Sequence, residues 1–556
     1  MNNKQQSLTL SFLGGVGEVG KNMLALEYGG EILVIDCGLT FPTDDMPGID
    51  IVIPDDTYLI NNRARIKGII LTHGHEDHIG AVPYVLKKIK APIFGSRLTL
   101  ALLENKLREK KITNTKLNTV KPGSVVKIGN FSVEFLKMTH SISGALAVAV
   151  TTPAGVYFHT GDFKIDMTPI DGDGIDFDRL SAIGKKNVLL MTADSTNAER
   201  KGFSMSEKNV GEALEDIFLE NKNKRIFLAT FSSNIHRIQQ VLDIAERHGR
   251  KVALGGRSMI NVCETAAKIG EIKYNPNNII DVKRIDRYPD NELCVLSTGS
   301  QGETNSALTR MSTGDFQKVK IGENDLIILS SSVIPGNEKA INRVVNQLFK
   351  LGATVIHESL ADVHVSGHAY QEELKLMHTL IKPKFFIPCH GEYKHLRAHA
   401  KLTVEMGMPA RNILIPELGS KIAVNKNSIK FLDNVIAGAK LVDGSGMGEI
   451  DGDVINERIQ LSKEGICVIA LTISHSTGTF SSEPSIVLRG LMYNEKETAE
   501  MLDELRIFVL TSINNINFKM QNWEVVKGLL RKSITNFFYK KYSSRPVVLP
   551  LIIETN

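Results

Sequence analysis

The sequence has few cysteines and no long apolar runs, and both shortages limit the classes of protein to which it can belong. Five cysteines are scattered through 556 residues, odd in number and without CxxC spacing. We therefore expect reduced thiols and a cytoplasmic protein. The first residues lack the apolar core of a signal peptide. No uncharged run approaches the roughly 20 residues of a membrane span, so we expect no membrane partner.

A large excess of either charge is also missing. The net charge of +4 neither requires nor excludes a polyanionic partner. With 42% hydrophobic and 23% charged residues, the chain has the composition of an ordinary globular protein. Its length predicts three or four domain-sized units.

Histidine is sparse as well, with 15 residues in the chain, yet three histidines and an aspartate gather in residues 72–78, THGHEDH. This stretch follows an apolar run that is typical of a buried strand. Neutral imidazoles and carboxylates are the ligands of zinc and similar divalent ions. His73 and His75 can face one ion, while Asp77 and His78, further round the loop, can face a second.

Later strands also end in a histidine or an acid, which is how sites form at one edge of an α/β sheet. His140 follows one strand and completes the first ion's ligands. Asp162 follows another and can bridge two ions through its two oxygens. Asp194 and His390 end two further strands. His159 lies inside its strand, and we interpret it as a packing residue.

Residues 14–20 contain a formal GxGxxG. A dinucleotide-binding fingerprint must open a helix, but strand patterns surround these glycines. We therefore expect a hairpin whose turn brings backbone close to a nearby site. Asp36, at the end of the next strand, has two open interpretations: an acceptor that orients a ligand of the histidine loop, or a turn-forming residue.

The combination of HxHxDH, a later histidine, a TGD aspartate and an early IDCG resembles the metallo-β-lactamase hydrolase fold, over about residues 7–200. After it, a second set of alternating strand and helix patterns predicts an inserted doubly wound domain. This order resembles the β-CASP branch, whose members cut nucleic acids. The phrases LGGVGEVGKN, DSTNAE, FSSNIHR, STGSQGE, HVSGHA and HGEYKHL together resemble the bacterial ribonuclease J family over nearly the full length.

The expected fold class is α/β: a metallo-β-lactamase αββα sandwich with an inserted doubly wound β-CASP domain and a small C-terminal α/β domain. The expected domains are 1–207 and 371–437 for the metallo-β-lactamase domain, 208–370 for the β-CASP domain, 438–450 for a flexible linker and 451–556 for the C-terminal domain.

The residues and the resemblance together imply a site for two divalent ions, with zinc favoured and manganese also suited. The expected metal ligands are His73, His75, Asp77, His78, His140, Asp162 and His390. The expected catalytic residues are Asp77, Asp194 and His368. The resemblance implies that His368 is the general acid and that Asp194 orients its ring. The expected RNA-phosphate contacts are Ser232, Ser233, His364, Val365, Ser366, Gly367 and His368.

The resemblance implies a ribonuclease with 5′-to-3′ exonuclease activity that prefers a 5′ monophosphate, and with endonuclease activity. It would act in RNA maturation, rRNA processing and mRNA decay, by two-metal hydroxide attack on the phosphodiester. Single-stranded RNA is the expected substrate. A homodimer or homotetramer is expected, with a paralogous ribonuclease J subunit and other RNA-decay enzymes as further partners.

Three other functions fit parts of the sequence. A small-molecule hydrolase, such as a thioesterase or lactonase, would share the histidine loop, but the inserted domain and His368 count against it. A catalytically dead scaffold subunit would have a damaged metal motif, whereas every ligand position is filled here. A DNA-specific nuclease of the same branch is disfavoured by the ribonuclease J phrases.

Two further features remain open. Residues 519–545 carry seven cations and one acid, with aromatic residues interleaved. This pattern fits RNA contact or an amphipathic helix with a solvated basic face. Cys389 stands where the family resemblance predicts a small apolar residue, and a thiol beside a metal ligand could be sensitive to oxidation.

Overall fold

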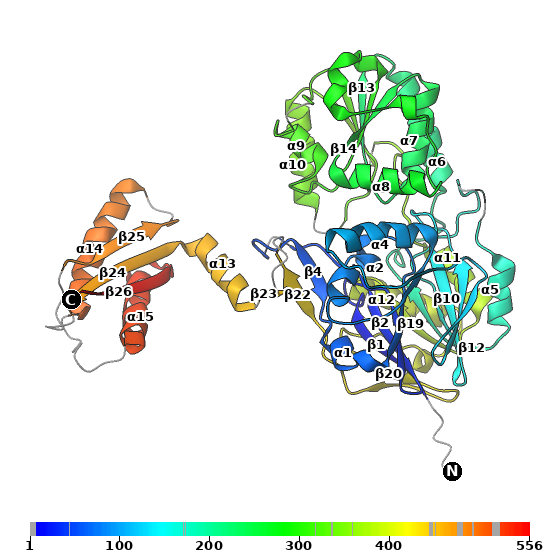
Figure 1. Ribbon diagram of the computed structural model, residues 1–556, viewed down its shortest axis with the longest axis horizontal. Helices are drawn as coiled ribbons and strands as arrows, with labels where there is room; N and C mark the ends of the chain where they lie inside the picture. The colour runs from blue at the N-terminus through cyan, green and yellow to red at the C-terminus, as the bar shows by residue number, and fades with distance from the viewer. Residues whose placement is uncertain are drawn as a thin grey trace, which may run out of the picture. The chain divides into compact units, whose positions relative to one another are not determined.

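The computed structural model divides the chain into two compact units, Met1–Thr40 with Val52–Lys440, and Phe41–Ile51 with Leu441–Asn556. The first unit contains a sandwich domain and an inserted domain, the latter green in Figure 1. The structure describes residues 7–43, 45–170, 172, 174–316, 319–334, 337–358, 360–443, 449–450, 452–474, 482–491, 494–513 and 523–555.

Two mixed sheets form the sandwich domain. The eight-stranded sheet has the order β21 (Ile429–Leu432), β20 (Lys421–Val424), β1 (Leu8–Gly14), β2 (Met23–Tyr28), β3 (Glu31–Ile35), β5 (Ile66–Ile70), β6 (Ile93–Gly95) and β7 (Leu117–Thr119). The six-stranded sheet has the order β19 (Phe385–Cys389), β12 (Val188–Asp194), β11 (Gly155–His159), β10 (Leu146–Thr152), β9 (Phe131–Lys137) and β8 (Val125–Ile128).

Strand β10 shows how these layers pack, because successive side chains of a strand face opposite sides of its sheet. Val148 and Val150 lie in the core between the two sheets. Ala147 and Ala149 lie in a second core, on the outer face that helices cover. The helices of this domain are α1 (Thr57–Asn61), α2 (Glu76–Ile79), α3 (Val82–Val85), α4 (Arg97–Glu109), α5 (Phe177–Gly184), α11 (Gln371–Ile381) and α12 (Tyr393–Glu405).

Parallel pairing sets the position of the site. Strand β3 runs parallel to β5, and β11 runs parallel to β12, which runs parallel to β19. Strand β9 has the same direction as β11, since both are antiparallel to β10. The loops that leave the carboxyl ends of these strands therefore share one edge of the sandwich, which is where α/β folds place their sites.

The inserted domain is a parallel sheet with helices on both faces. Its strand order is β15 (Ile279–Ile280), β14 (Lys251–Gly255), β16 (Leu293–Ser297), β13 (Arg225–Ala229), β17 (Asp325–Leu329) and β18 (Thr354–His357). Its helices are α6 (Glu207–Glu220), α7 (Ile235–Arg247), α8 (Arg257–Lys268), α9 (Ala307–Ser312) and α10 (Glu338–Lys350). The chain leaves β13 towards β14 and later returns to β17 on the other side. Such a reversal opens a crevice at the carboxyl ends of the strands.

The chain then returns to the sandwich domain, as the sequence predicts. Strand β19 joins the edge of the six-stranded sheet, and β20 pairs with β1 in the eight-stranded sheet. Helix α8 of the inserted domain lies next to α4 of the sandwich (Figure 1), where Asn105 Nδ2 donates to Thr265 Oγ1 at 2.6 Å. The predicted fold class is therefore confirmed for both domains of this unit.

The second unit is the small α/β domain that the sequence predicts. Its sheet has the order β25 (Ser485–Arg489), β24 (Ile466–Ser474) and β26 (Val547–Thr555), and its helices are α13 (Gly452–Glu464), α14 (Glu495–Ile513) and α15 (Trp523–Tyr542). In α15, Val526, Leu530, Ile534 and Phe538 are buried at a spacing of four residues. This favours the amphipathic interpretation of the basic segment. Lys519 of that segment lies outside the described residues.

The predicted flexible linker is partly regular. Residues Ala439–Val442 form strand β22, which pairs with β23 (Glu449–Ile450), and β4 (Ile51–Pro54) belongs to the same sheet. Lys440 Nζ lies 3.3 Å from an oxygen of Asp55, so an ion pair fixes a stretch whose glycine content predicts freedom. Residues 444–448 of the linker lie outside the described part of the chain.

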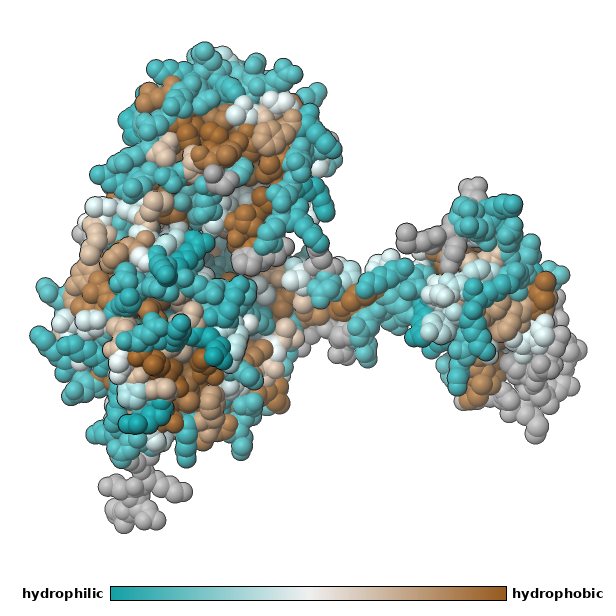
Figure 2. Space-filling view, turned by 180° about the vertical axis from the view of Figure 1, so that it is seen from behind, coloured by the Kyte–Doolittle hydropathy of each residue, from teal (hydrophilic) through white to brown (hydrophobic). Residues whose placement is uncertain are grey.

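Hydrophilic side chains cover most of the face in Figure 2, and the hydrophobic ones gather in separate patches. Within the residues that the structure describes, no helix combines the length and the apolar character needed to cross a membrane.

Candidate metal centre

Three imidazoles form the first ligand group. His73 and His75 lie in the loop after β5, and His140 follows β9. His75 Nδ1 lies 3.0 Å from His73 Nε2 and 3.2 Å from His140 Nε2. Zinc–nitrogen bonds of about 2.0–2.1 Å in a tetrahedron put neighbouring nitrogens about 3.3 Å apart. The spacing of this group therefore fits a shared divalent ion.

Two carboxylates and two imidazoles form the second group. His78 Nε2 lies 3.1 Å from Asp162 Oδ2, and His390 Nε2 lies 3.2 Å from Asp77 Oδ2. Their ligand atoms all lie within 4.8 Å of one another. Asp162 Oδ2 is also 3.8 Å from His73 Nε2 in the first group. This carboxylate thus lies between the two groups, where a bridging ligand would be.

The first group is held neutral, which a metal-binding imidazole requires. Burial and the neighbouring imidazoles hold the pKa of His73 and of His140 well below the usual range. Burial also lowers the pKa of His75 to about 4. Near neutral pH these rings therefore keep a free lone pair for an ion.

The second group concentrates negative charge. Burial would raise the pKa of Asp77 and of Asp162, but His78 and His390 outweigh it and hold both well below the usual range. Burial would likewise lower the pKa of His390, but Asp162 and the other nearby carboxylates hold it well above the usual range. The charged imidazoles thus supply the positive charge that ionised acids need in a buried site. A divalent ion would take over that role, with release of the imidazole protons.

Hydrogen bonds orient several ligand rings. Asp36 Oδ2 lies 2.8 Å from His78 Nδ1, and Asp36 also accepts the backbone N–H and the hydroxyl of Thr72. The Gly367 carbonyl lies 2.6 Å from His140 Nδ1. An N–H on each Nδ1 leaves Nε2 free for an ion, which is the arrangement of metal-bound histidines. Of the two interpretations of Asp36, the contacts favour the acceptor that orients a ligand.

The glycine-rich turn contacts this centre through its backbone, as the sequence predicts. The Gly15 carbonyl accepts the backbone N–H of His390 at 2.8 Å. Gly17 and Glu18 form isolated β-bridges with residues 391–392. Gly15 has a φ of +76°, a conformation that a residue with a β-carbon rarely adopts.

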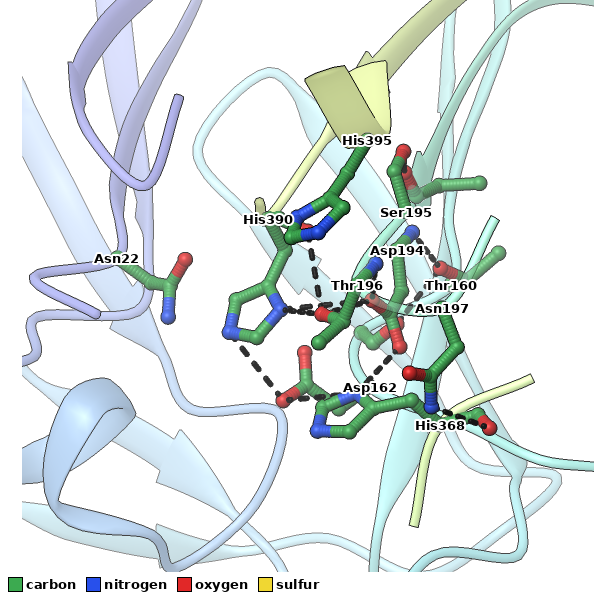
Figure 3. A network of polar contacts seen from close by, with 12 residues as sticks. Asn22, Thr160, Asp162, Asp194, Ser195, Thr196, Asn197, His368, His390 and His395 are labelled. Atoms are coloured by element: carbon green, nitrogen blue, oxygen red, sulfur yellow. Dashed lines mark hydrogen bonds and ion pairs between the residues drawn. The ribbon is translucent and has the colours of Figure 1, made fainter. Parts of the chain in front are cut away.

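A third set of polar residues adjoins the second group (Figure 3). Asp194 Oδ2 lies 2.7 Å from His368 Nδ1, while Asp194 Oδ1 accepts the Thr196 hydroxyl at 2.7 Å. The same hydroxyl lies 2.6 Å from His390 Nδ1. Asp194, His368, Asp162 and His390 also converge closely enough to hold an ion. Asp162 and His390 already belong to the second group, so Asp194 and His368 form a hydrogen-bonded pair beside the two groups.

The predicted phosphate contacts lie on two segments. Ser232 Oγ, before α7, is 2.7 Å from Ser258 Oγ. His364 Nε2 lies 3.1 Å from Ser332 Oγ, and Val365 is buried. No hydrogen bond among the described residues joins Ser232 or Ser233 to the 364–368 segment.

Asn197 Nδ2 donates to Ser366 Oγ at 2.6 Å and to the His368 carbonyl at 3.3 Å. A β-carbon at Gly367 would lie 2.7 Å from His140 Cε1, so only glycine fits there. The segment that carries His368 is therefore anchored directly to the metal centre.

Sequence reasoning missed three polar residues of the site. Asn22 Nδ2 lies 3.3 Å from Asp77 Oδ2 and 3.1 Å from His78 Nε2. Thr196 contacts Asp194 and His390, and Asn197 contacts Ser366 and His368, as described above. The signal in the sequence was their position: Asn22 closes the glycine turn, and Thr196 and Asn197 lie in the loop that begins after Asp194.

Two residues near the centre do not join it. His159 Nδ1 hydrogen-bonds with Thr192 Oγ1 at 2.7 Å, and burial lowers its pKa to about 4. Burial and the nearby carboxylates raise the pKa of the Cys389 thiol well above its usual range. Only the thiolate reacts readily, so the structure argues against the oxidation sensitivity that the sequence suggested.

An αββα sandwich with two adjoining His/Asp groups at one edge defines a hydrolase of the metallo-β-lactamase class. The family models agree with this class. Residues 16–192 match the metallo-β-lactamase superfamily, and residues 353–416 match a Zn-dependent metallo-hydrolase RNA specificity domain. Residues 223–348 match the ribonuclease J β-CASP domain, and residues 453–555 match the ribonuclease J C-terminal domain. The chain belongs to the ribonuclease J family of metal-dependent RNA hydrolases.

Several curated relatives match along almost the whole chain. Ribonuclease J of Synechocystis sp. is 39% identical, over 100% of this chain and 88% of the relative. Ribonuclease J2 of Bacillus subtilis is 38% identical, over 99% of each protein. Ribonuclease J of Thermus thermophilus is 38% identical, over 98% of this chain and 94% of the relative.

One solved structure is described as a protein of unknown function from Enterococcus faecalis V583. The two chains align with a TM-score of 0.52 and 19% identity, over 75% of this chain and 100% of the Enterococcus faecalis chain. At this identity it shows the fold alone.

Proposed function

We propose that the chain is a 5′-to-3′ exoribonuclease with endonuclease activity that prefers 5′-monophosphorylated, single-stranded RNA. Its cellular work would be RNA maturation, including rRNA processing, and mRNA decay. The observation that carries the proposal is the Asp194–His368 pair, joined at 2.7 Å beside the metal groups. It gives a metallo-hydrolase site the acid that an RNA leaving group needs.

In this proposal seven side chains hold two divalent ions, zinc or manganese. The first group is His73, His75 and His140, the second is Asp77, His78 and His390, and Asp162 bridges them. When bound, such ions supply an activated water as nucleophile and positive charge to stabilise the reacting phosphate. The remaining Asp77 contact, to Asn22 Nδ2 at 3.3 Å, keeps that carboxylate turned towards the centre.

His368 protonates the leaving 3′ oxygen. Its Nδ1 is engaged by Asp194 Oδ2, so Nε2 is the atom that can face substrate. Burial would lower the pKa of His368, but Asp194 and Asp162 outweigh it and raise the pKa above its usual value. The raised pKa favours the charged form of the ring, which can donate its Nε2 proton, as a general acid must.

A pocket for the 5′ phosphate fits the crevice of the inserted domain. The direction of the chain reverses between β13 and β17, and ligands bind at such points in doubly wound sheets. His364 and Ser332 lie there. Burial, followed by the charges of Arg237, Lys164 and Arg200, lowers the pKa of His364 to about 3. Of these cations, Arg237 and Lys164 pair with Glu207 and Asp166, so Arg200 is the one whose charge we propose favours a phosphate near the neutral His364.

The second unit supports the proposal of a homodimer or homotetramer. Leu549, Leu551 and Ile553 are exposed, and as alternate residues of β26 they lie on one face of its sheet. Val487 is exposed on β25, at the other side of the central strand β24, and aligns with Leu549 through Val468 of that strand. An apolar sheet face of this kind suits contact with another subunit. A paralogous subunit and other RNA-decay enzymes are the further partners that we propose.

The competing functions differ in substrate, so one experiment separates them. A 5′-labelled RNA, the DNA of the same sequence and a small thioester are each incubated with the protein, with and without a chelator. We expect cleavage of RNA alone, and its loss with the chelator. Hydrolysis of the thioester would favour a small-molecule hydrolase, equal cleavage of DNA would remove the RNA specificity, and no cleavage of any substrate would favour a scaffold.

A further inference from the structure

Arg237 occurs in the phrase FSSNIHR, one helical turn after the serines that we expect at the RNA phosphate. An arginine there would ordinarily be read as a phosphate ligand, since its guanidinium matches a phosphate. In the structure, the Arg237 side chain points into the protein instead. Arg237 is 0% exposed, and among the described residues it is the largest side chain that is fully buried. It therefore does not touch substrate.

The guanidinium instead holds the chain where it enters the inserted domain. Arg237 Nε donates to Glu207 Oε1 at 2.7 Å, and the side chain of Glu207 is 5% exposed. Glu207 is the first residue of α6 and so follows the connection from the sandwich domain. Its backbone N–H donates to Asp166 Oδ2 at 3.0 Å. That aspartate lies four residues after Asp162.

The other side of the Arg237 guanidinium holds the chain where it leaves the inserted domain. Arg237 Nη1 donates to the Val363 carbonyl at 2.8 Å and contacts the Ser330 hydroxyl. Ser330 Oγ donates to the same carbonyl at 2.6 Å. Val363 immediately precedes residues 364–368, which carry the proposed pocket and His368. One guanidinium thus ties both connections and the end of β17 together.

A buried ion pair is weak evidence for stability, because desolvation of the two charges offsets much of their attraction. Its better-supported use is to specify one arrangement of the groups that it joins. The far end of the 364–368 segment has a separate anchor, since Asp194 and Asn197 hold His368 and Ser366. The near end is held by the contacts to the Val363 carbonyl and by His364 Nε2, which lies 3.1 Å from Ser332 Oγ.

We propose that Arg237 is a positioning residue for 5′-end selection: through the Val363 carbonyl it sets the place of His364. The inference rests on the proposed 5′-phosphate pocket. It follows that loss of the Arg237 guanidinium contacts displaces the pocket, while the metal ligands and His368 keep their own contacts. A displacement of about 1 Å can reduce a rate by up to roughly a hundredfold.

Two variants separate positioning from stability. In Arg237→Lys the charge opposite Glu207 remains, but one ammonium cannot also reach the Val363 carbonyl. In the double variant Arg237→Met, Glu207→Leu the whole pair is replaced by apolar side chains, a change that proteins often tolerate. Arg250→Met is the matched control. Arg250 is also buried, 2% exposed, and donates to the carbonyls of Lys224 and Leu293. It immediately precedes β14, so it lies at the amino ends of the strands, away from the carboxyl ends where the pocket is proposed.

The measurement is kcat/KM for RNA with a 5′ monophosphate divided by that for the same RNA with a 5′ triphosphate. Cleavage of a circular RNA, which has no 5′ end, reports the chemistry alone. We expect both Arg237 variants to lower the ratio by between roughly ten- and a hundredfold, mostly through KM. Circular RNA should be cleaved within about threefold of the wild-type rate, and Arg250→Met should keep the wild-type ratio.

Retention of the wild-type ratio by both folded Arg237 variants would overturn the inference. So would an equal loss with circular RNA, since that would show general damage to the site. A wild-type protein without any 5′ preference would instead refute the pocket itself, which is part of the proposed function.

Discussion

His368→Ala removes the group that we assign as the acid and leaves the metal ligands in place. The imidazole is 21% exposed and touches Asp194 through Nδ1. Towards the ligand set, its Nδ1 lies 4.0 Å from Asp162 Oδ2 and its ring stacks on that of His390 with the centroids 5.4 Å apart. The metal content should therefore equal that of the wild type, whereas the cleavage step should slow.

General acids contribute roughly 10²–10⁴ to a rate, so single-turnover cleavage of RNA should fall by that factor. The loss depends on the leaving group, because a sulfur leaving group departs without a proton. An RNA with sulfur in place of the bridging 3′ oxygen at the cut should be cleaved at nearly equal rates by the variant and the wild type. His248→Ala is the matched control, since His248 pairs with Glu215 away from the centre.

The pH profile provides a second readout of the same change. Because the nearby carboxylates raise the pKa of His368 above its usual value, the wild-type rate should fall as pH rises through that pKa. This limb should be absent from the variant. The acid assignment is refuted if His368→Ala cleaves ordinary RNA at the wild-type rate, or if the sulfur substrate shows the same loss as ordinary RNA.

Two further changes test other parts of the site, and a third tests a buried histidine outside it. His75→Ala should lose both bound metal after dialysis and activity, because His75 Nδ1 lies within 3.2 Å of both other imidazoles of its group; retained metal would refute the first group. Thr196→Val should slow cleavage by roughly ten- to a hundredfold and Thr196→Ser should not, since the hydroxyl joins Asp194 to His390; equal rates would contradict this. Burial lowers the pKa of His378 to about 3, so below pH 6.5 the unfolded chain binds more protons at this residue than the folded chain does. The free energy of unfolding therefore falls as the pH falls, and this residue alone lowers it by about 2 kcal/mol at pH 5. In urea titrations His378→Gln should narrow the gap between pH 7.5 and pH 5, and an unchanged gap would refute the buried neutral ring.

The fold was predictable where strands are apolar throughout and end in a short polar loop. Such strands can only be buried on both faces, and their order then resembles a known arrangement. The stretch after residue 437 shows the limit of this reasoning. Its glycines predict freedom, but Lys440 pairs with Asp55 in the folded chain, and no local pattern reports that contact.

The candidate site was predictable in its ligands and less so in their support. Residues 72–78 concentrate histidines within one loop, so local sequence suffices. His390 becomes a ligand candidate only once strand order places it at the same edge. Thr196 and Asn22 act through one hydroxyl and one amide, residue types too common to stand out. Gly367 shows a different limit, because the contact that the structure adds is made by its backbone carbonyl.

The central claim is that this metal centre removes nucleotides from a 5′-monophosphorylated end. Its most direct test uses one RNA, labelled in its first nucleotide and prepared with a 5′ monophosphate or a 5′ triphosphate, with products resolved by length over time. We expect early release of the labelled mononucleotide from the monophosphate form, little release from the triphosphate form, and none with a chelator. Equal release from both forms, or release that survives the chelator, would contradict the claim.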